Sequence, residues 1–343
     1  MSALSAFITA LSGPELLADE RALLRAARPC GVILFARNIV APAQVRRLTS
    51  GIRDAVGSEH LMLLVDQEGG RVQRLGPPHW RALPPGAQYA AAYAHDPARA
   101  VHAAELVARL MAHDLREAGF NTDCAPVLDL PVSGSHAVIG DRAFGETPGQ
   151  VVALAGAVVR GFAAGGILPV IKHIPGHGRA TSDSHHDLPV VDTPRAALTV
   201  TDFAPFAALA HVPAAMTAHV VFSSIDPALP ASVSPAVTAD VIRGAIGYQG
   251  LLMSDDLGMK ALSGTIAQKA AAVFRAGSDV ALLCSGELGE TEAVAAVAPP
   301  LEGEPLRRLE RASAVFRQQP RPFDVREAEA ALAEICKARP ESV

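Results

Sequence analysis

The chain has 343 residues, of which 50% are hydrophobic and 19% charged, and its formal net charge is −5 at pH 7. This composition supports a large folded core and excludes an intrinsically disordered chain. The slightly acidic balance offers no general basic surface for nucleic acid or for an anionic membrane, so we expect no nucleic-acid partner and no membrane association.

The four cysteines, Cys30, Cys124, Cys284 and Cys336, lie far apart and form no CxxC pair. Each lies in or near an apolar run, which predicts buried free thiols and fits a reducing cytosol. The first 20 residues lack a basic segment before their short apolar stretch, and no apolar run approaches the length of a membrane-spanning helix. We therefore expect a cytoplasmic protein.

Short apolar runs recur along the chain, and each is followed by an Ala-rich segment with helical spacing. The helix candidate at 97–119 has Pro97 placed for a first turn and Gly119 for a C-terminal cap. This alternation is typical of parallel strands joined by helices. In chain order the runs are FITALS (7–12), GVILF (31–35), LMLLVD (61–66), TDCAPVLDL (122–130), ILPVIKH (167–173), AAMTAHV (214–220), GLLMSDD (250–256) and DVALLC (279–284).

The pattern continues from end to end without a flexible linker or a charge block. It predicts an α/β protein whose residues 1–343 form a single (β/α)8 TIM-type barrel, with the C-terminal helices packed on it. The alternative is an open doubly wound sheet, but no glycine-rich dinucleotide fingerprint and no P-loop follows the first strands.

Polar residues stand where these apolar runs end. In a barrel of parallel strands all these positions meet at the C-terminal mouth, where the loops build the active site. The residues are Arg37, Asn38, Asp66, Asp129, Lys172, His173, His219, Asp255 and Asp256.

Two adjacent carboxylates end the run GLLMSDD. A carboxylate held by a rigid strand end is suited to act as a nucleophile or a general base. The competing interpretation is that Ser254 or Asp256 caps a following helix. Because Asp255 and Asp256 are neighbours, one can face the mouth while the other caps.

The stretch LLVDQEGGRVQRL places Asp66 at a strand end, before two glycines and the arginines Arg71 and Arg74. An aspartate and an arginine can bracket sugar hydroxyls or a carboxylate, and glycines allow close approach of the backbone to a ligand. An internal Asp–Arg ion pair at a turn is the alternative. The same choice applies to Arg142, which either pairs with Asp141 or reaches into the pocket.

Residues 171–191, IKHIPGHGRATSDSHHDLPVV, carry four histidines on a loop rich in proline and glycine. Zinc sites favour regular short spacings such as HExxH on a helix, and this template is absent, so we expect no metal. Asp183 and His185 are spaced so that the aspartate can orient the imidazole, which could then transfer a proton. For His177, His186 and Asp187 we expect solvated loop positions.

Taken together, these stretches resemble glycoside hydrolase family 3, in particular the single-domain bacterial β-N-acetylhexosaminidases of the NagZ type. The resemblance covers most of the chain and implies a barrel fold, in agreement with the pattern of strands and helices. The motifs occur in the family's order: GVILFARN, VDQEGGRVQRL, APVLDL, IGDRAFG, KHIPGHG with DSH, MTAHVVF and GLLMSDDLGM.

The resemblance also implies roles for individual residues. Asp255 corresponds to the nucleophile, His185 to the acid/base and Asp183 to the residue that orients it. The substrate-binding positions correspond to Asp66, Arg74, Arg142, Lys172 and His173.

The expected activity is that of a retaining exo-β-N-acetylglucosaminidase that needs no cofactor. The expected substrates are muropeptide or amino-sugar fragments of the cell wall, such as N-acetylglucosamine linked to 1,6-anhydro-N-acetylmuramic acid, and we expect a monomer. The alternatives are a glycoside phosphorylase of the same family, a metal-dependent hydrolase that uses the histidine-rich loop, and an inactive sugar-binding protein.

Overall fold

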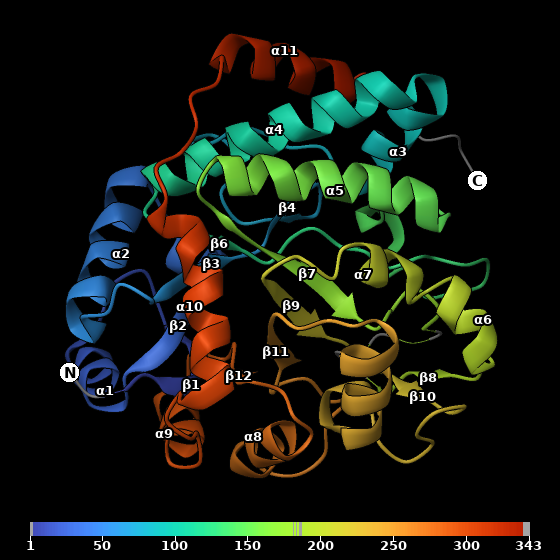
Figure 1. Cartoon of the computed structure of the whole chain (residues 1–343). Helices are drawn as coiled ribbons and strands as arrows, with labels where there is room; N and C mark the ends of the chain where they lie inside the picture. The colour runs from blue at the N-terminus through green and yellow to red at the C-terminus, as the bar shows by residue number, and fades with distance from the viewer. Residues whose placement is uncertain (1–2, 181, 183, 185–186, 339–343) are drawn as a thin grey trace.

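The computed structural model describes residues 3–180, 182, 184 and 187–338, and the statements below concern these residues (Figure 1). Eight parallel strands form a closed barrel in the order β1-β12-β11-β9-β7-β6-β3-β2, which confirms the predicted (β/α)8 architecture. The strands are β1 (Ser5–Ala10), β2 (Pro29–Leu34), β3 (Met62–Val65), β6 (Thr122–Asp123), β7 (Leu168–Ile174), β9 (Ala214–Thr217), β11 (Leu251–Asp256) and β12 (Val280–Leu282).

Helices between the strands surround the barrel (Figure 1). Helix α4 (Pro97–Glu117) has its N-terminus capped by the Asp96 side chain, and Gly119 behind it has φ +92°, a conformation that favours glycine. Other helices between strands are α1 (Ala18–Ala27), α2 (Pro42–Val56), α5 (Pro148–Ala164), α6 (Arg195–Val200), α7 (Ala204–Ala208) and α8 (Ile266–Arg275), with a π-helical segment at Val237–Ala245. Helix α9 (Leu288–Ala295) follows the last strand.

The barrel strands are apolar on both faces, because one face packs inside the barrel and the other against the helices. Ile33, Leu64, Ile171 and Met253 are all 1% exposed or less. The strand predicted at 122–130 is regular only at Thr122–Asp123, since Pro126 has no N–H to donate, and the chain pairs again at a single bridge between Val127 and Lys172.

Further short helices and strands lie in the loops at the carboxyl ends of the barrel strands. A hairpin of β4 (Gln67–Gly69) and β5 (Val72–Gln73) and a helix α3 (Gly86–His95) follow β3. Strands β8 (Val190–Val191) and β10 (Val221–Phe222) pair in a separate small sheet. Turns of 3-10 helix lie at Ala36–Asn38, Gly140–Arg142 and Ala231–Val233. These short elements carry no periodic pattern, so the sequence does not predict them.

Two helices follow the last strand and α9. Helix α10 (Gly303–Arg317) lies against the amino-terminal end of the barrel, where Arg308 binds Asp279, the residue before β12, at 2.7 Å. Helix α11 (Val325–Ile335) packs on α4 (Figure 1) and is held there by an ion pair between Arg99 and Glu334. None of the helices in the described ranges combines the length and apolarity needed to cross a membrane.

All four cysteines are free thiols. Cys30 and Cys124 are buried and Cys284 is half-buried, but Cys336 is exposed, so the prediction of buried thiols is wrong for Cys336. Cys336 follows the last residue of α11 as its C-cap, and this position at the end of the helix leaves it exposed.

Candidate active site

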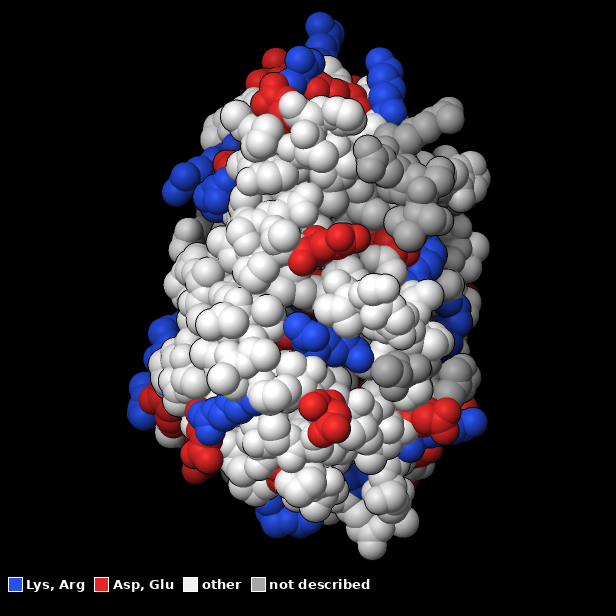
Figure 2. Space-filling view, turned by 90° about the vertical axis from the view of Figure 1, so that its right-hand side faces the viewer, with Lys and Arg blue, Asp and Glu red and all other residues white. Residues whose placement is uncertain are grey.

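The carboxyl ends of β3, β7 and β11 bring Asp66, Lys172, His173 and Asp255 to the same mouth of the barrel, as the strand-end pattern predicts. Figure 2 shows the side of the molecule toward which β7 points in Figure 1. A few acidic and basic side chains lie there within largely uncharged surface (Figure 2).

Lys172 is the centre of an ion-pair network at this mouth. Its ammonium lies 2.9 Å from Oδ1 of Asp66 and 2.6 Å from Oε1 of Glu68. Glu68 also accepts two hydrogen bonds from the guanidinium of Arg142, both 2.8 Å long. Arg74 approaches the other oxygen of Asp66 at 3.4 Å. The five residues join the β3 end, the β4–β5 hairpin, β7 and the 139–142 turn.

The sequence allows Arg142 either to pair with Asp141 or to reach into the pocket, and the structure excludes the pairing with Asp141. Arg142 pairs with Glu68, while Asp141 pairs with Arg71 at 2.8 Å on the surface. Glu68 itself was not among the predicted site residues. The available signal was its position two residues after Asp66, because alternate residues of an extended segment point to the same side.

Opposite charges keep this network ionised in spite of burial. Burial acts to raise the pKa of Glu68, but Lys172 and Arg142 outweigh it and hold that pKa well below the ordinary value. Burial likewise acts to lower the pKa of Lys172, and Asp66 and Glu68 reverse the effect and raise it. The side chains of Lys172 and Glu68 are only 3% and 7% exposed, so water screens their attraction weakly.

Asp129 organises the histidines that follow β7. One of its oxygens lies 2.6 Å from Nδ1 of His173, and the other accepts the backbone N–H groups of His173 and His177. Burial acts to raise the pKa of Asp129, but the two histidines outweigh it, and the pKa is lowered. Because Nδ1 of His173 is bound to Asp129, its Nε2 is the nitrogen left for another partner.

The prediction that His177 is a solvated loop residue is wrong. His177 is 3% exposed, and its Nε2 lies 3.0 Å from the hydroxyl of Ser184, which is itself 2% exposed. Burial, and after it the neighbouring His173, lower the pKa of His177 to about 4, so the ring is neutral near pH 7. Asp187 is exposed, as expected. Asp183, His185 and His186 lie outside the described residues.

Asp255 and Asp256 end β11 and differ in their surroundings. Asp256 accepts the backbone N–H groups of Gly258 and Cys284 at 3.0 and 2.9 Å, so it closes the turn after the strand and does not cap a helix. Oδ1 of Asp255 accepts the N–H of Asp256 at 2.8 Å. Burial acts to raise the pKa of Asp255, but His173, His219, this hydrogen bond and Lys172 lower it below the ordinary value.

The buried His219 supports the end of β11 from the side of β9. Its Nε2 lies 3.0 Å from the carbonyl oxygen of Asp256, which requires Nε2 to carry the proton, and its Nδ1 lies 2.6 Å from the Ser232 hydroxyl. Burial lowers the pKa of His219. A neutral His219 that donates to Asp256 thus fixes the backbone next to Asp255.

The polar residues after β2 are structural. Arg37 donates to the carbonyl oxygens of Leu11 and Cys284, and Asn38 bonds backbone groups of Phe35, Leu11 and Gly13. Within the ranges that the structure describes, no group of three or more His, Cys, Asp or Glu side chains is arranged to hold a metal ion.

Known proteins resemble the chain over most of its length. The family model "Glycosyl hydrolase family 3 N terminal domain" matches residues 8–314. A β-hexosaminidase of Alkalilimnicola ehrlichii is 44% identical over 291 residues, which are 84% of this chain and 81% of that protein. A β-hexosaminidase of Chromobacterium violaceum is 40% identical over 305 residues, or 88% of this chain and 84% of that protein.

Solved structures show the same likeness. Native NagZ from Neisseria gonorrhoeae superposes with a TM-score of 0.85 at 30% identity, covering 98% of this chain and 99% of that protein. The same gonococcal protein has also been solved with a zinc ion and superposes with a TM-score of 0.84 at 29% identity, covering 98% and 99% of the two chains.

Proposed function

This chain belongs to glycosyl hydrolase family 3, and we propose that it is a retaining exo-β-N-acetylglucosaminidase. The observation that carries the proposal is the setting of Asp255. This carboxylate ends a rigid strand, its pKa is held below the ordinary value by its surroundings, and it shares the barrel mouth with the Asp66, Lys172 and His173 side chains. The likeness to the β-hexosaminidases supports the same activity.

In the proposed reaction Asp255 attacks the anomeric carbon of the terminal sugar while His185 gives a proton to the departing glycosidic oxygen. The product of this step is a covalent glycosyl-enzyme. His185 then takes a proton from water, the water oxygen attacks the anomeric carbon, and the bond to Asp255 breaks. Two successive displacements at one carbon retain its configuration. Asp183 would hold the imidazole in the correct orientation and stabilise its charged form.

The sugar would be held by the network around Lys172. Asp66 and Arg74 are the more accessible members, with side chains 15% and 27% exposed, and we assign them to sugar hydroxyls. Lys172 and Arg142 are 3% and 11% exposed and lie behind them. With His173, these two cations would complete the polar wall that recognises the N-acetylated sugar.

The proposed substrates are small fragments of the cell wall, in particular N-acetylglucosamine joined to 1,6-anhydro-N-acetylmuramic acid, with or without a peptide. The proposed setting is the cytoplasmic recycling of peptidoglycan by a monomer that uses no cofactor. This finer assignment rests on the likeness to the NagZ-type enzymes, and the residues at the mouth support it through their capacity to bind a neutral polar sugar.

Turnover of three chromogenic substrates tests the proposal: a β-N-acetylglucosaminide, the matching β-glucoside and the matching β-N-acetylgalactosaminide. A pocket that hydrogen-bonds an amide penalises the analogue without it, because the buried polar groups of the protein then lack partners. We expect the specificity constant for the glucoside to be at least about a hundredfold lower than that for the N-acetylglucosaminide. Equal constants for glucoside and N-acetylglucosaminide would refute the assignment of the sugar.

Proton NMR of the first-formed product tests the retaining mechanism. A β-configured initial product is expected, and an α-configured one would contradict the double displacement. The same reaction run with inorganic phosphate separates hydrolysis from phosphorolysis, since only a phosphorylase forms the sugar 1-phosphate. We expect free N-acetylglucosamine under both conditions.

A further inference from the structure

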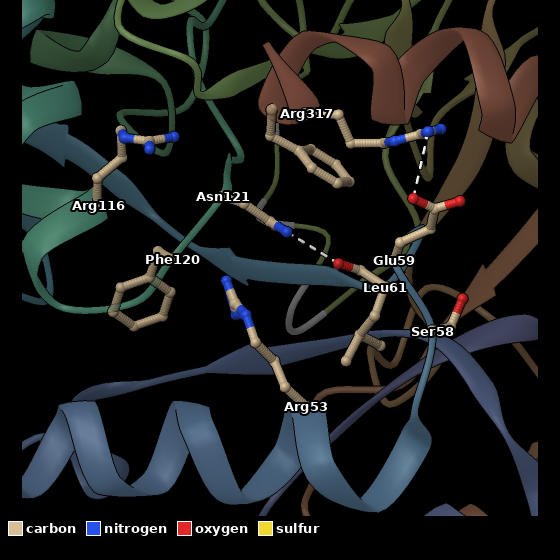
Figure 3. Close-up of a pocket in the computed structure, with 9 residues that line it drawn as sticks. Arg53, Ser58, Glu59, Leu61, Arg116, Phe120, Asn121 and Arg317 are labelled. Atoms are coloured by element: carbon tan, nitrogen blue, oxygen red, sulfur yellow. Dashed lines mark hydrogen bonds and ion pairs between the residues drawn. The ribbon is translucent and has the colours of Figure 1, made fainter. Parts of the chain in front are cut away.

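A cavity of about 330 Å³ lies at the end of the barrel opposite the mouth. Figure 3 shows the residues on its wall. Leu61 and Asn121 on its wall directly precede β3 and β6, so the cavity adjoins the amino-terminal ends of two parallel strands. We call it the basal cavity. It shares no residue with the site at the mouth.

Three arginines line the basal cavity, and each comes from a different helix. Arg53 comes from the last turn of α2, Arg116 from the last turn of α4 and Arg317 from the end of α10 (Figure 3). The one carboxylate on the wall is Glu59, which pairs with Arg317 at 3.2 Å. Within the described residues, no carboxylate lies at ion-pairing distance from Arg53 or Arg116.

Hydrogen bonds to carbonyl oxygens behind helix C-termini explain part of this arginine cluster. Arg53 donates through Nη2 to the carbonyl oxygen of Gly119 at 2.8 Å, and Arg116 donates through Nη1 to that of Gly166 at 3.4 Å. Cations near helix C-termini are favourable in themselves. However, a guanidinium has five N–H donors, and each of these contacts uses one of them. Both guanidiniums therefore retain donors for a further partner.

The positive charges of Arg53 and Arg116 also repel each other. Burial lowers the pKa of Arg53, and the charge of Arg116 lowers it further. A second cavity of about 290 Å³ shares Arg116 and adds Arg109 and Arg321 to its wall, with Glu117 as its carboxylate. In a chain of net charge −5, the walls of these two cavities therefore carry a local excess of cations, which favours an anionic ligand.

We propose that the basal cavity binds a phosphate group, inorganic or carried on a small organic molecule, between Arg53 and Arg116. Phosphate offers several oxygens at once, which suits two planar guanidiniums that approach from different helices. The rings of Phe120 and Phe316 on the cavity wall would pack against an apolar part of an organic phosphate. The proposal does not depend on the reaction at the mouth.

Isothermal titration of the full chain with inorganic phosphate, and separately with phenyl phosphate, tests the site. The variants are Arg53→Gln and Arg116→Gln, and the matched control is Arg47→Gln, an exposed arginine on the same helix as Arg53. Each titration is run at constant ionic strength and repeated with saturating N-acetylglucosamine, which would occupy the mouth. Circular dichroism verifies that each variant is folded. Because Arg116 is exposed, Arg116→Gln should disturb folding less than Arg53→Gln.

The expected result is saturable binding of at least one of the two phosphates, unchanged by N-acetylglucosamine and by Arg47→Gln. Arg53→Gln and Arg116→Gln should each weaken phosphate binding about tenfold or more, since each removes a hydrogen bond to a charged group. Tighter binding of phenyl phosphate would identify an organic phosphate as the ligand. Absence of saturable binding, or binding that both variants retain, would overturn the proposal and leave the arginines as caps of helix ends.

Discussion

Lys172 and Glu68 form an ion pair of 2.6 Å that ties strand β7 to the β4–β5 hairpin. Both side chains are almost completely buried, and each has a second partner of opposite charge, Asp66 for Lys172 and Arg142 for Glu68. Glu68 therefore positions Lys172 and Arg142, the two cations of the proposed sugar-binding wall, although its own oxygens are occupied by them.

We expect Glu68→Gln to reduce both stability and activity. The substitution leaves Lys172 and Arg142 buried with less negative charge, and breaking a buried pair of this kind costs about 3–5 kcal/mol of unfolding free energy. The specificity constant should fall about tenfold or more, because misplaced binding groups lose orientation of the substrate. Chemical denaturation and steady-state kinetics measure the two effects.

The matched control for Glu68→Gln is Asp141→Asn, which removes the exposed ion pair with Arg71. Surface pairs contribute about 0–1 kcal/mol, so this variant should be close to the unmodified protein in both measurements. Equal losses in the two variants would show that the Glu68 network has no special role.

The contribution of Glu68 should depend on pH in one direction. Its pKa in the folded protein is lowered, so the carboxylate stabilises the fold fully above the unfolded-state pKa of about 4.3. That contribution is lost as the pH falls below this value toward the folded-state pKa. The difference in unfolding free energy between the unmodified protein and Glu68→Gln should be constant from about pH 6 to 8 and shrink below about pH 4. A difference that grows in acid would contradict this assignment.

Asp255→Ala should abolish nearly all turnover with little loss of stability, because the covalent intermediate cannot form. Asp256→Ala should retain more activity and lose about 1–3 kcal/mol of unfolding free energy, since the N–H groups of Gly258 and Cys284 lose their acceptor. Activity assays and thermal denaturation of both variants provide the comparison. An inactive Asp256→Ala beside an active Asp255→Ala would reverse the assignment of the nucleophile.

His185→Ala should slow substrates with poor leaving groups far more than activated aryl glycosides. A positioned acid is worth about 10²–10⁴-fold when the departing oxygen is too basic to leave unprotonated, whereas a nitrophenolate needs little help. Asp183→Asn should give the same pattern more mildly. The measurement is the glycosylation rate on a disaccharide and on an aryl glycoside. Equal slowing of both substrates would direct the search for the acid/base to His173 or His177.

Dialysis against a chelator should leave the activity unchanged, because the proposed chemistry needs only a carboxylate and an imidazole. Addition of zinc after dialysis is the control. Activity that disappears with the chelator and returns with zinc would favour the metal-dependent alternative. Metal analysis of the protein as purified would accompany the assay.

The sequence alone was sufficient to predict the barrel and the polar residues that meet at its mouth. Apolar runs alternate with helical segments, and parallel topology then requires the residues that end the runs to meet at one mouth. For this reason the strand-end pattern by itself brings Asp66, Lys172 and Asp255 together, although they are separated by 106 and 83 positions along the chain.

Only the tertiary structure decided how these side chains pair. Arg142 binds Glu68 and not its neighbour Asp141, and His177 is buried against Ser184 and not solvated. Pairing of this kind depends on how loops after different strands pack over one another, and no local periodicity encodes that packing. The local hydrophobic pattern and the parallel topology determine where the strand ends lie. The ion pairs in a buried site depend on distances between side chains, and these distances are set only when the barrel closes.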